Sequence, residues 1–145
     1  MRLRYFVLLV LIFSCSLIFS QSNKHNSWVI ELDENVNYPL TEQELLFIKT
    51  AYNEESFNRI ITIKALKQNV KDILRNRVQI LTKSYYVTES LPKLSSISNS
   101  NTPKIFNKIN FNPLLYDFDF ESPKSQIYRV DGTEFIINII PRKLK

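Results

Sequence analysis

The sequence has very few of the residues on which catalytic and cofactor sites depend: 145 residues include one cysteine, one histidine and one glycine. The single glycine, Gly132, excludes the glycine-rich loops that bind phosphates or dinucleotides. The only cysteine, Cys15, lies in an apolar run near the N-terminus and permits no intramolecular disulfide. The only histidine, His25, lies in a polar stretch that lacks the ordered surroundings of a zinc site or catalytic triad. No motif in the sequence indicates a cofactor.

The N-terminus has the pattern of a secretory signal peptide. Arg2 and Arg4 precede an apolar run over 5–19. This run is shorter than the roughly 20 apolar residues that cross a bilayer, and Ser20 is a small residue at a cleavage site. We therefore expect residues 1–20 to be removed on export to the periplasm or the medium, leaving no integral membrane span.

Cys15 leaves a second interpretation open. The residues 12–15 resemble the end of a lipoprotein signal, in which Cys15 would be acylated and the product would be an outer-membrane lipoprotein. The apolar run, however, continues past the cysteine to Phe19. Cleavage after Ser20 is the favoured interpretation.

The charge balance is mild. The chain has 19 Lys and Arg against 14 Asp and Glu, a formal charge of +5, and removal of Arg2 and Arg4 lowers it by two to +3. A charge this small does not indicate binding to nucleic acid. The length predicts one domain, which we expect at 41–145 after a flexible segment at 21–40.

The first half of this domain has helical patterns. Thr41 and Glu44 have the spacing of a capping box, which predicts a helix start. Asn53 predicts a break and the cap of a second helix. We expect that helix to run on to Asn76, because Arg77 would fall within its apolar face.

One side of the second helix carries basic residues, and this basic stripe consists of Lys64, Lys67, Lys71 and Arg75. It is a candidate site for an anionic lipid or an acidic partner. The simpler interpretation is the solvated side of an amphipathic helix.

The second half of the domain has strand patterns. A period of two from Arg77 predicts a strand that reaches as far as Val87, and a short strand is expected at 28–32. The polar run over 88–110 predicts a long surface loop that is either mobile or functional. Asp131-Gly132 between two β-rich segments predicts a hairpin with a two-residue turn. That turn pairs Tyr128 with Phe135, Arg129 with Glu134, and Val130 with Thr133.

Alternating aromatic and acidic residues predict a further strand near the hairpin. Asp117, Asp119 and Glu121 would lie on one face of it, about 7 Å apart along the strand, where carboxylates can bind a hard cation. They also resemble the D-x-D-x-E strand of chitinase-type glycosidases, which suggests a hydrolytic alternative, but that family requires a barrel of about 250 residues. An acidic face turned toward water is the simpler interpretation.

Three segments carry a resemblance to a known family: Lys71–Val78, Phe111–Leu114 together with Tyr116 and Phe118, and Tyr128–Thr133. They are similar to segments of small exported proteins from flavobacteria and related Bacteroidota, and Phe19-Ser20-Gln21 is similar to signal ends in that group. The resemblance implies a bacterial envelope setting. No activity is assigned to that family, so it supplies no catalytic residues.

Together these patterns predict an α+β fold, with N-terminal helices packed on one face of a small C-terminal antiparallel sheet that ends in a hairpin. The leading functional hypothesis is an exported, non-catalytic envelope protein that binds another envelope protein. The alternatives are a small metal-binding or hydrolytic module that uses Asp117, Asp119 and Glu121, and a lipoprotein acylated at Cys15.

Overall fold

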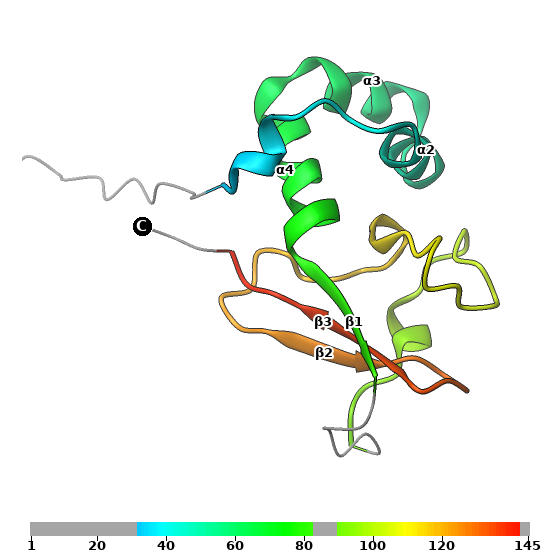
Figure 1. Ribbon diagram of the computed structural model, residues 1–145. Coiled ribbons are helices and arrows are strands. Elements are labelled where there is room, and N and C mark those ends of the chain that lie inside the picture. The colour runs from blue at the N-terminus through cyan, green and yellow to red at the C-terminus, as the bar shows by residue number, and fades with distance from the viewer. Residues whose placement is uncertain (1–31, 83–89, 143–145) are drawn as a thin grey trace, which may run out of the picture.

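The computed structural model describes residues 32–82 and 90–142. Over these ranges the chain forms helices first and an antiparallel sheet second (Figure 1), so the predicted α+β class is confirmed. The α-helices are α2 (Glu42–Ala51), α3 (Glu54–Thr62) and α4 (Lys64–Asn76), and the strands are β1 (Val78–Thr82), β2 (Gln126–Arg129) and β3 (Phe135–Ile139). Short 3-10 turns form at η1 (Glu34–Asn37), η3 (Leu94–Ile97) and η4 (Pro113–Leu115).

Several predictions fall outside these ranges. They concern the signal peptide at 1–20, Cys15, His25, most of the strand at 28–32 and the extension of β1 to Val87. Within the described ranges, none of the helices combines the length and hydropathy needed to cross a membrane.

The start of α2 is the predicted capping box. The Thr41 hydroxyl accepts the Glu44 N–H at 3.2 Å, and the Glu44 carboxylate accepts the Thr41 N–H at 2.8 Å. The start of α3 is capped by Asn53, whose side-chain oxygen accepts the N–H of Ser56 at 2.8 Å. Both caps satisfy N–H groups that a helix cannot pair internally.

The prediction of one continuous helix from Glu54 to Asn76 is wrong. The chain leaves helical geometry at Ile63 (φ −84°, ψ 114°), where α3 ends and α4 begins. A straight helix would separate Ile60 and Val70 by roughly 15 Å, yet both pack in one apolar cluster with Ile48 of α2. The break allows α3 to fold back on α4, so that both helices bury their apolar sides in the same place.

The end of α4 at Asn76 is confirmed, and Arg77 joins this helix directly to β1. Arg77 is buried, and its guanidinium donates to the carbonyl oxygens of Ile140 at 2.7 Å and of Phe120. Its side chain therefore links the start of β1 to two later segments of the chain, one around Phe120 and one that follows β3. Burial lowers the pKa of Arg77 below its usual value, and the nearby charge of Arg142 acts in the same direction.

The strands lie in the order β1-β3-β2, all antiparallel. The predicted hairpin between β2 and β3 is present, but its predicted register is wrong. Tyr128 lies opposite Ile137 instead of Phe135, and Arg129 lies opposite Ile136 instead of Glu134.

The turn explains the different register. The Thr133 N–H donates to the Val130 carbonyl at 3.3 Å, and Gly132 has a φ of +65°. No other described residue has a positive φ, so this turn is not type I′, which requires two such residues. A turn with only its third residue at positive φ does not match the twist of a tight hairpin. The loop therefore extends to Glu134, and Val130 bonds to Phe135.

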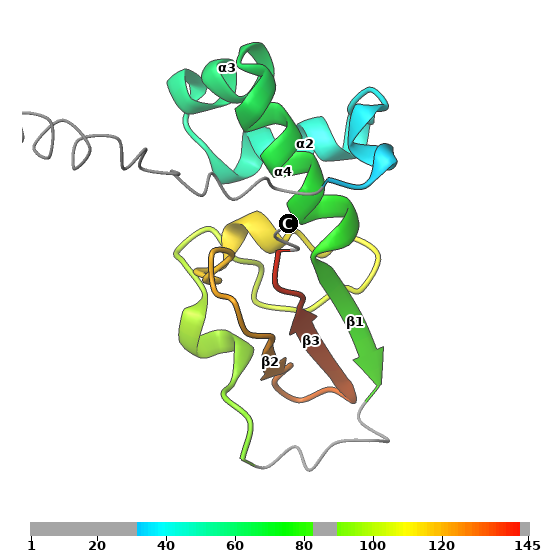
Figure 2. The same ribbon diagram turned by 90° about the vertical axis from the view of Figure 1, so that its left-hand side faces the viewer.

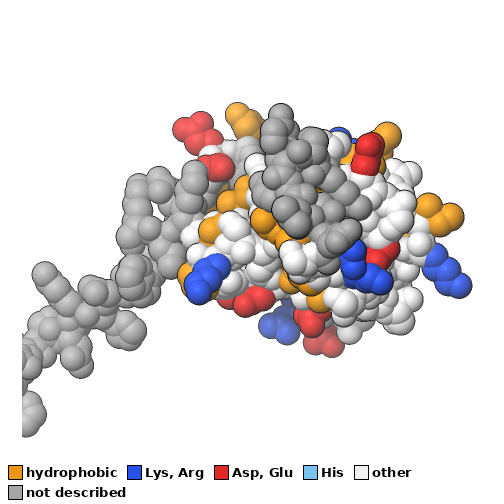
Figure 3. Space-filling model, turned by 90° about the horizontal axis from the view of Figure 1, so that it is seen from below, with side chains coloured by type: hydrophobic (Ala, Val, Ile, Leu, Met, Phe, Trp, Pro, Cys, Tyr) orange, Lys and Arg blue, Asp and Glu red, His pale blue; other side chains and the backbone are white. Residues whose placement is uncertain are grey.

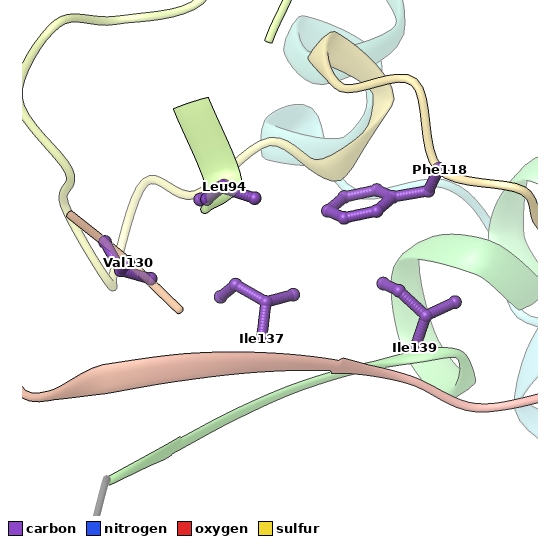
Figure 4. Packing of buried hydrophobic residues seen from close by; sticks show 5 residues of the cluster. All are labelled: Leu94, Phe118, Val130, Ile137 and Ile139. Carbon is purple, nitrogen blue, oxygen red and sulfur yellow. The ribbon is translucent and has the colours of Figure 1, made fainter. Parts of the chain in front are cut away.

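The inner face of the sheet carries the larger of two apolar clusters. Figure 4 shows five of its buried side chains pointing toward one another: Leu94, Phe118, Val130, Ile137 and Ile139. We expected helices to cover this face. Most of the covering side chains come instead from the irregular segment 94–120, while α2, α3 and α4 form the second cluster at one end of the sheet (Figure 1).

Candidate functional site

The basic stripe predicted on α4 is not a continuous exposed surface. Lys64 is exposed and Lys67 is half-buried, but Lys71 and Arg75 turn toward the segment that precedes α2. The stripe hypothesis assumed that all four side chains reach solvent, so it is wrong for Lys71 and Arg75. Their side chains connect α4 to the segment that precedes α2.

Arg75 forms a paired contact with the carboxylate that caps α2. Its Nε lies 2.6 Å from Oε1 of Glu44, and its Nη2 lies 2.7 Å from Oε2. The same guanidinium donates to the carbonyl oxygens of Asn35 and Pro39. We call these groups the Arg75 network. Hydrogen bonding to Arg75 holds the pKa of Glu44 below its usual value, and the carboxylate in turn raises the pKa of Arg75.

Lys71 is only 5% exposed, although the sequence places it among solvated lysines. Its Nζ donates to the carbonyl oxygens of Val36, at 2.8 Å, and Tyr38. Val36 lies in the segment predicted to be flexible, and its side chain is buried against α4. Burial lowers the pKa of Lys71, and the positive charge of Arg75 adds to that effect.

The carboxylates of Asp117, Asp119 and Glu121 do not form a site. The predicted strand is wrong, because this stretch is irregular and its backbone pairs only at an isolated bridge between Tyr116 and Ser98 in the described part of the chain. Asp119 accepts the backbone N–H of Glu121 at 3.1 Å, and Glu121 contacts Arg142 at 3.2 Å. Within 32–82 and 90–142, no three His, Cys, Asp or Glu side chains come close enough to hold a metal ion.

The long loop predicted at 88–110 is largely irregular where it is described, from residue 90 onward. It packs on the sheet: Leu94 is buried, and Ser98 pairs with Tyr116 through an isolated bridge. The Arg129 N–H donates to the Pro92 carbonyl at 2.9 Å. The loop thus covers the outer edge of β2.

Along the other edge of the sheet, formed by β1, the described residues provide no such cover. In an antiparallel pair of strands, every second residue directs its N–H and C=O groups toward the partner strand. Arg77 is such a residue, because its carbonyl accepts the N–H of Ile140. Gln79 and Leu81 therefore also direct their backbone groups toward β3. The N–H and C=O groups of Val78, Ile80 and Thr82 therefore point away from the sheet. No other strand in the described ranges pairs with this edge, and Figure 2 shows β1 along the outer side of the sheet.

The composition of β1 leaves this edge unprotected. Exposed edges are usually blocked by charged residues, proline or a bulge, since unpaired backbone groups attract other strands. Val78–Thr82 contains no charged residue, proline or glycine, and its pairing with β3 is continuous.

A cleft of about 240 Å³ lies beside this edge, between the two apolar clusters. Its apolar lining comes from α2, α4, β1 and the segment that leads to η4: Phe47, Leu74, Val78, Ile80, Ile109 and Phe111. Gln43 holds that segment near α2 through weak contacts of 3.4 Å to the Ile109 carbonyl and the Asn110 side chain. The cleft is neutral in character, because the charge of Glu44 at its rim is paired with Arg75.

The edge and the cleft together form the candidate binding site. The sequence predicted β1 as a strand but did not indicate that it lies at an edge. Its uncharged composition could not have signalled an edge, because strands at open edges normally carry a protective residue.

Comparison with known proteins identifies no relative: no family model, curated protein or solved structure matches the chain.

Proposed function

We propose that this protein is exported to the bacterial envelope and binds an extended segment of another protein, which adds as a fourth strand beside β1. The observation that carries the proposal is the uncharged edge of β1, which no described residue pairs with, next to an apolar cleft. The proposed role is binding without catalysis.

In strand addition, main-chain hydrogen bonds supply the affinity and side-chain pockets supply the specificity. Here these are the backbone groups of β1 and the cleft. The outward backbone groups of Val78, Ile80 and Thr82 bond to the main chain of any extended segment. Val78 and Ile80 also direct their side chains to the inner face, where both line the cleft. Every second side chain of the added strand falls on that same face. The site therefore selects a segment with an apolar side chain at the position facing the cleft.

The envelope setting rests on the sequence. Arginines followed by a short apolar run support export of a chain that begins at Gln21. Mass spectrometry of the protein from its producing cells tests this directly. A free N-terminus at Gln21 supports export to the periplasm or medium, an acylated Cys15 indicates a lipoprotein, and an intact Met1 contradicts export.

Amide hydrogen exchange tests the binding mode. In the free protein, we expect the outward amides of Val78, Ile80 and Thr82 to exchange fast and those of Gln79 and Leu81 to exchange slowly. A peptide selected on the purified protein from a displayed library of linear peptides should slow the three outward amides at least tenfold. The Gln79 and Leu81 amides serve as internal controls. Peptides that bind while the outward amides stay fast would show that β1 is not the binding edge.

Thr82 provides a matched pair of variants. Its side chain is exposed and its N–H faces outward, so Thr82→Pro removes one outward donor and leaves the pairing with Phe135 intact. We expect Thr82→Pro to weaken the selected peptides about five- to tenfold, and Thr82→Val to leave their affinity unchanged. Equal effects of both variants would contradict main-chain recognition.

A further inference from the structure

The segment that forms one wall of the cleft also carries the two most exposed large apolar side chains in the described ranges. Ile105 is 83% exposed and Ile109 is 84% exposed. Burial of these two side chains would be favourable, because it would remove their apolar surface from water. They lie four residues apart on the same loop.

Basic residues accompany both isoleucines. Lys104 precedes Ile105 and Lys108 precedes Ile109, and both lysines are exposed. The Lys108 ammonium lies over the ring of Phe135 at 5.5 Å, which places this lysine beside the sheet. Figure 3 shows apolar and basic side chains protruding next to one another at the side of the molecule where this loop lies in Figure 1.

The surrounding sequence carries no negative charge. Between Leu91 and Tyr116 there are three lysines and no aspartate or glutamate. Of the neighbouring elements, α2 contributes Glu42 and Glu44, and the charge of Glu44 is paired with Arg75. The β2–β3 turn contributes Asp131, which lines a hollow together with Lys104. The loop's own charges, next to its two isoleucines, are all positive.

We infer that this loop docks on the surface of an anionic membrane, with Ile105 and Ile109 entering the interface and Lys104 and Lys108 contacting lipid phosphates. The separation of the two isoleucines favours lipid over a protein partner. The exposed residues between and beside them are asparagines and lysines, so they form no continuous apolar patch of the kind a protein interface requires. A bilayer accepts isolated apolar side chains without matching their shape, and its phosphates attract the lysines.

Vesicle cosedimentation with the purified protein tests this inference. Vesicles of phosphatidylcholine with one quarter phosphatidylglycerol should bind the protein, and binding should fall with added salt. The double variant Ile105→Ser/Ile109→Ser should lower the bound-to-free ratio about tenfold. The double variant Lys104→Gln/Lys108→Gln should remove the preference over pure phosphatidylcholine.

Ile63 provides a matched control. It is an exposed isoleucine that also lies next to a lysine, Lys64, but at the junction of α3 and α4. Ile63→Ser should leave vesicle binding unchanged. The inference is overturned if the wild-type protein does not bind, or if Ile63→Ser lowers binding as much as the loop variant. It is also overturned if the serine pair abolishes self-association in sedimentation velocity while vesicle binding persists. Ile109 also lines the cleft, but strand addition is tested separately, by the outward β1 amides of the wild-type protein, so failure here leaves strand addition standing.

Discussion

Replacement of Arg75 by glutamine separates a structural role from a binding role. Were Arg75 one residue of a solvated basic stripe, its loss would change the free energy of unfolding by less than about 0.5 kcal/mol. In the structure its guanidinium bonds to Glu44 and to the carbonyls of Asn35 and Pro39. Removing it takes away the cation paired with Glu44, which keeps only the Thr41 N–H, and takes one donor from each of the two carbonyls.

The size of the effect follows from burial. Exposed ion pairs contribute about 0–1 kcal/mol, whereas breaking a buried pair costs about 3–5 kcal/mol. The Arg75 and Glu44 side chains are 15% and 13% exposed, which places this pair nearer the buried case. We expect Arg75→Gln to lower the free energy of unfolding by about 3 kcal/mol, which corresponds to roughly 15 °C in Tm for a domain of this size.

Urea unfolding followed by circular dichroism measures this loss. Lys64→Gln is the matched control, because it removes an exposed positive charge from the same helix. It should change the free energy of unfolding by less than about 0.5 kcal/mol. A loss below about 1 kcal/mol for Arg75→Gln, or equal losses for both variants, would refute the structural role of the Arg75 network.

The same pair predicts a pH dependence. Arg75 holds the pKa of folded Glu44 below its usual value of 4.5. The folded state therefore binds this proton less readily than the unfolded state, and the stabilisation is fully present above pH 4.5. It is lost as the pH falls through the folded pKa. The difference between wild type and Arg75→Gln should be full at neutral pH and smaller near pH 3, and a difference that grows in acid would contradict the assignment.

Two further predictions concern single positions. Gly132→Ala should destabilise the protein by about 1–2 kcal/mol, because a φ of +65° is strained for alanine, although nothing lies within 4 Å of the added carbon. Gly132→Asn should destabilise it less, and equal losses for the two variants in thermal unfolding would contradict this. Ile48→Ala should cost about 2–5 kcal/mol, because Ile48 is fully buried between α2, α3 and α4, and a cost below about 1 kcal/mol would show that this cluster repacks.

Helix caps, strands and turns could be predicted where they depend on a few residues that are close in sequence. Thr41 and Asn53 cap helices because each side chain satisfies an N–H three residues away. The strand β1 and the hairpin also follow from local patterns. The hairpin register did not, because the presence of Asp131-Gly132 leaves open whether one or both residues adopt positive φ.

The candidate site was less predictable. The sequence indicated Lys71 and Arg75 as surface residues because their spacing places them opposite the apolar side of α4. Residue spacing on α4 cannot reveal that the segment around Val36 packs against the basic side of this helix. The edge position of β1 depends on strand order, which distant segments decide.

The sequence by itself determined the class of fold, the caps of α2 and α3, the C-terminal end of α4, and the absence of residues for several kinds of chemistry. Contacts over long sequence separations decided the rest: the break at Ile63, the inward turn of Lys71 and Arg75, and the open edge of β1. A pattern records which side of an element is apolar. Which neighbour covers each side, and which backbone groups stay unpaired, is fixed only when all elements compete for burial together.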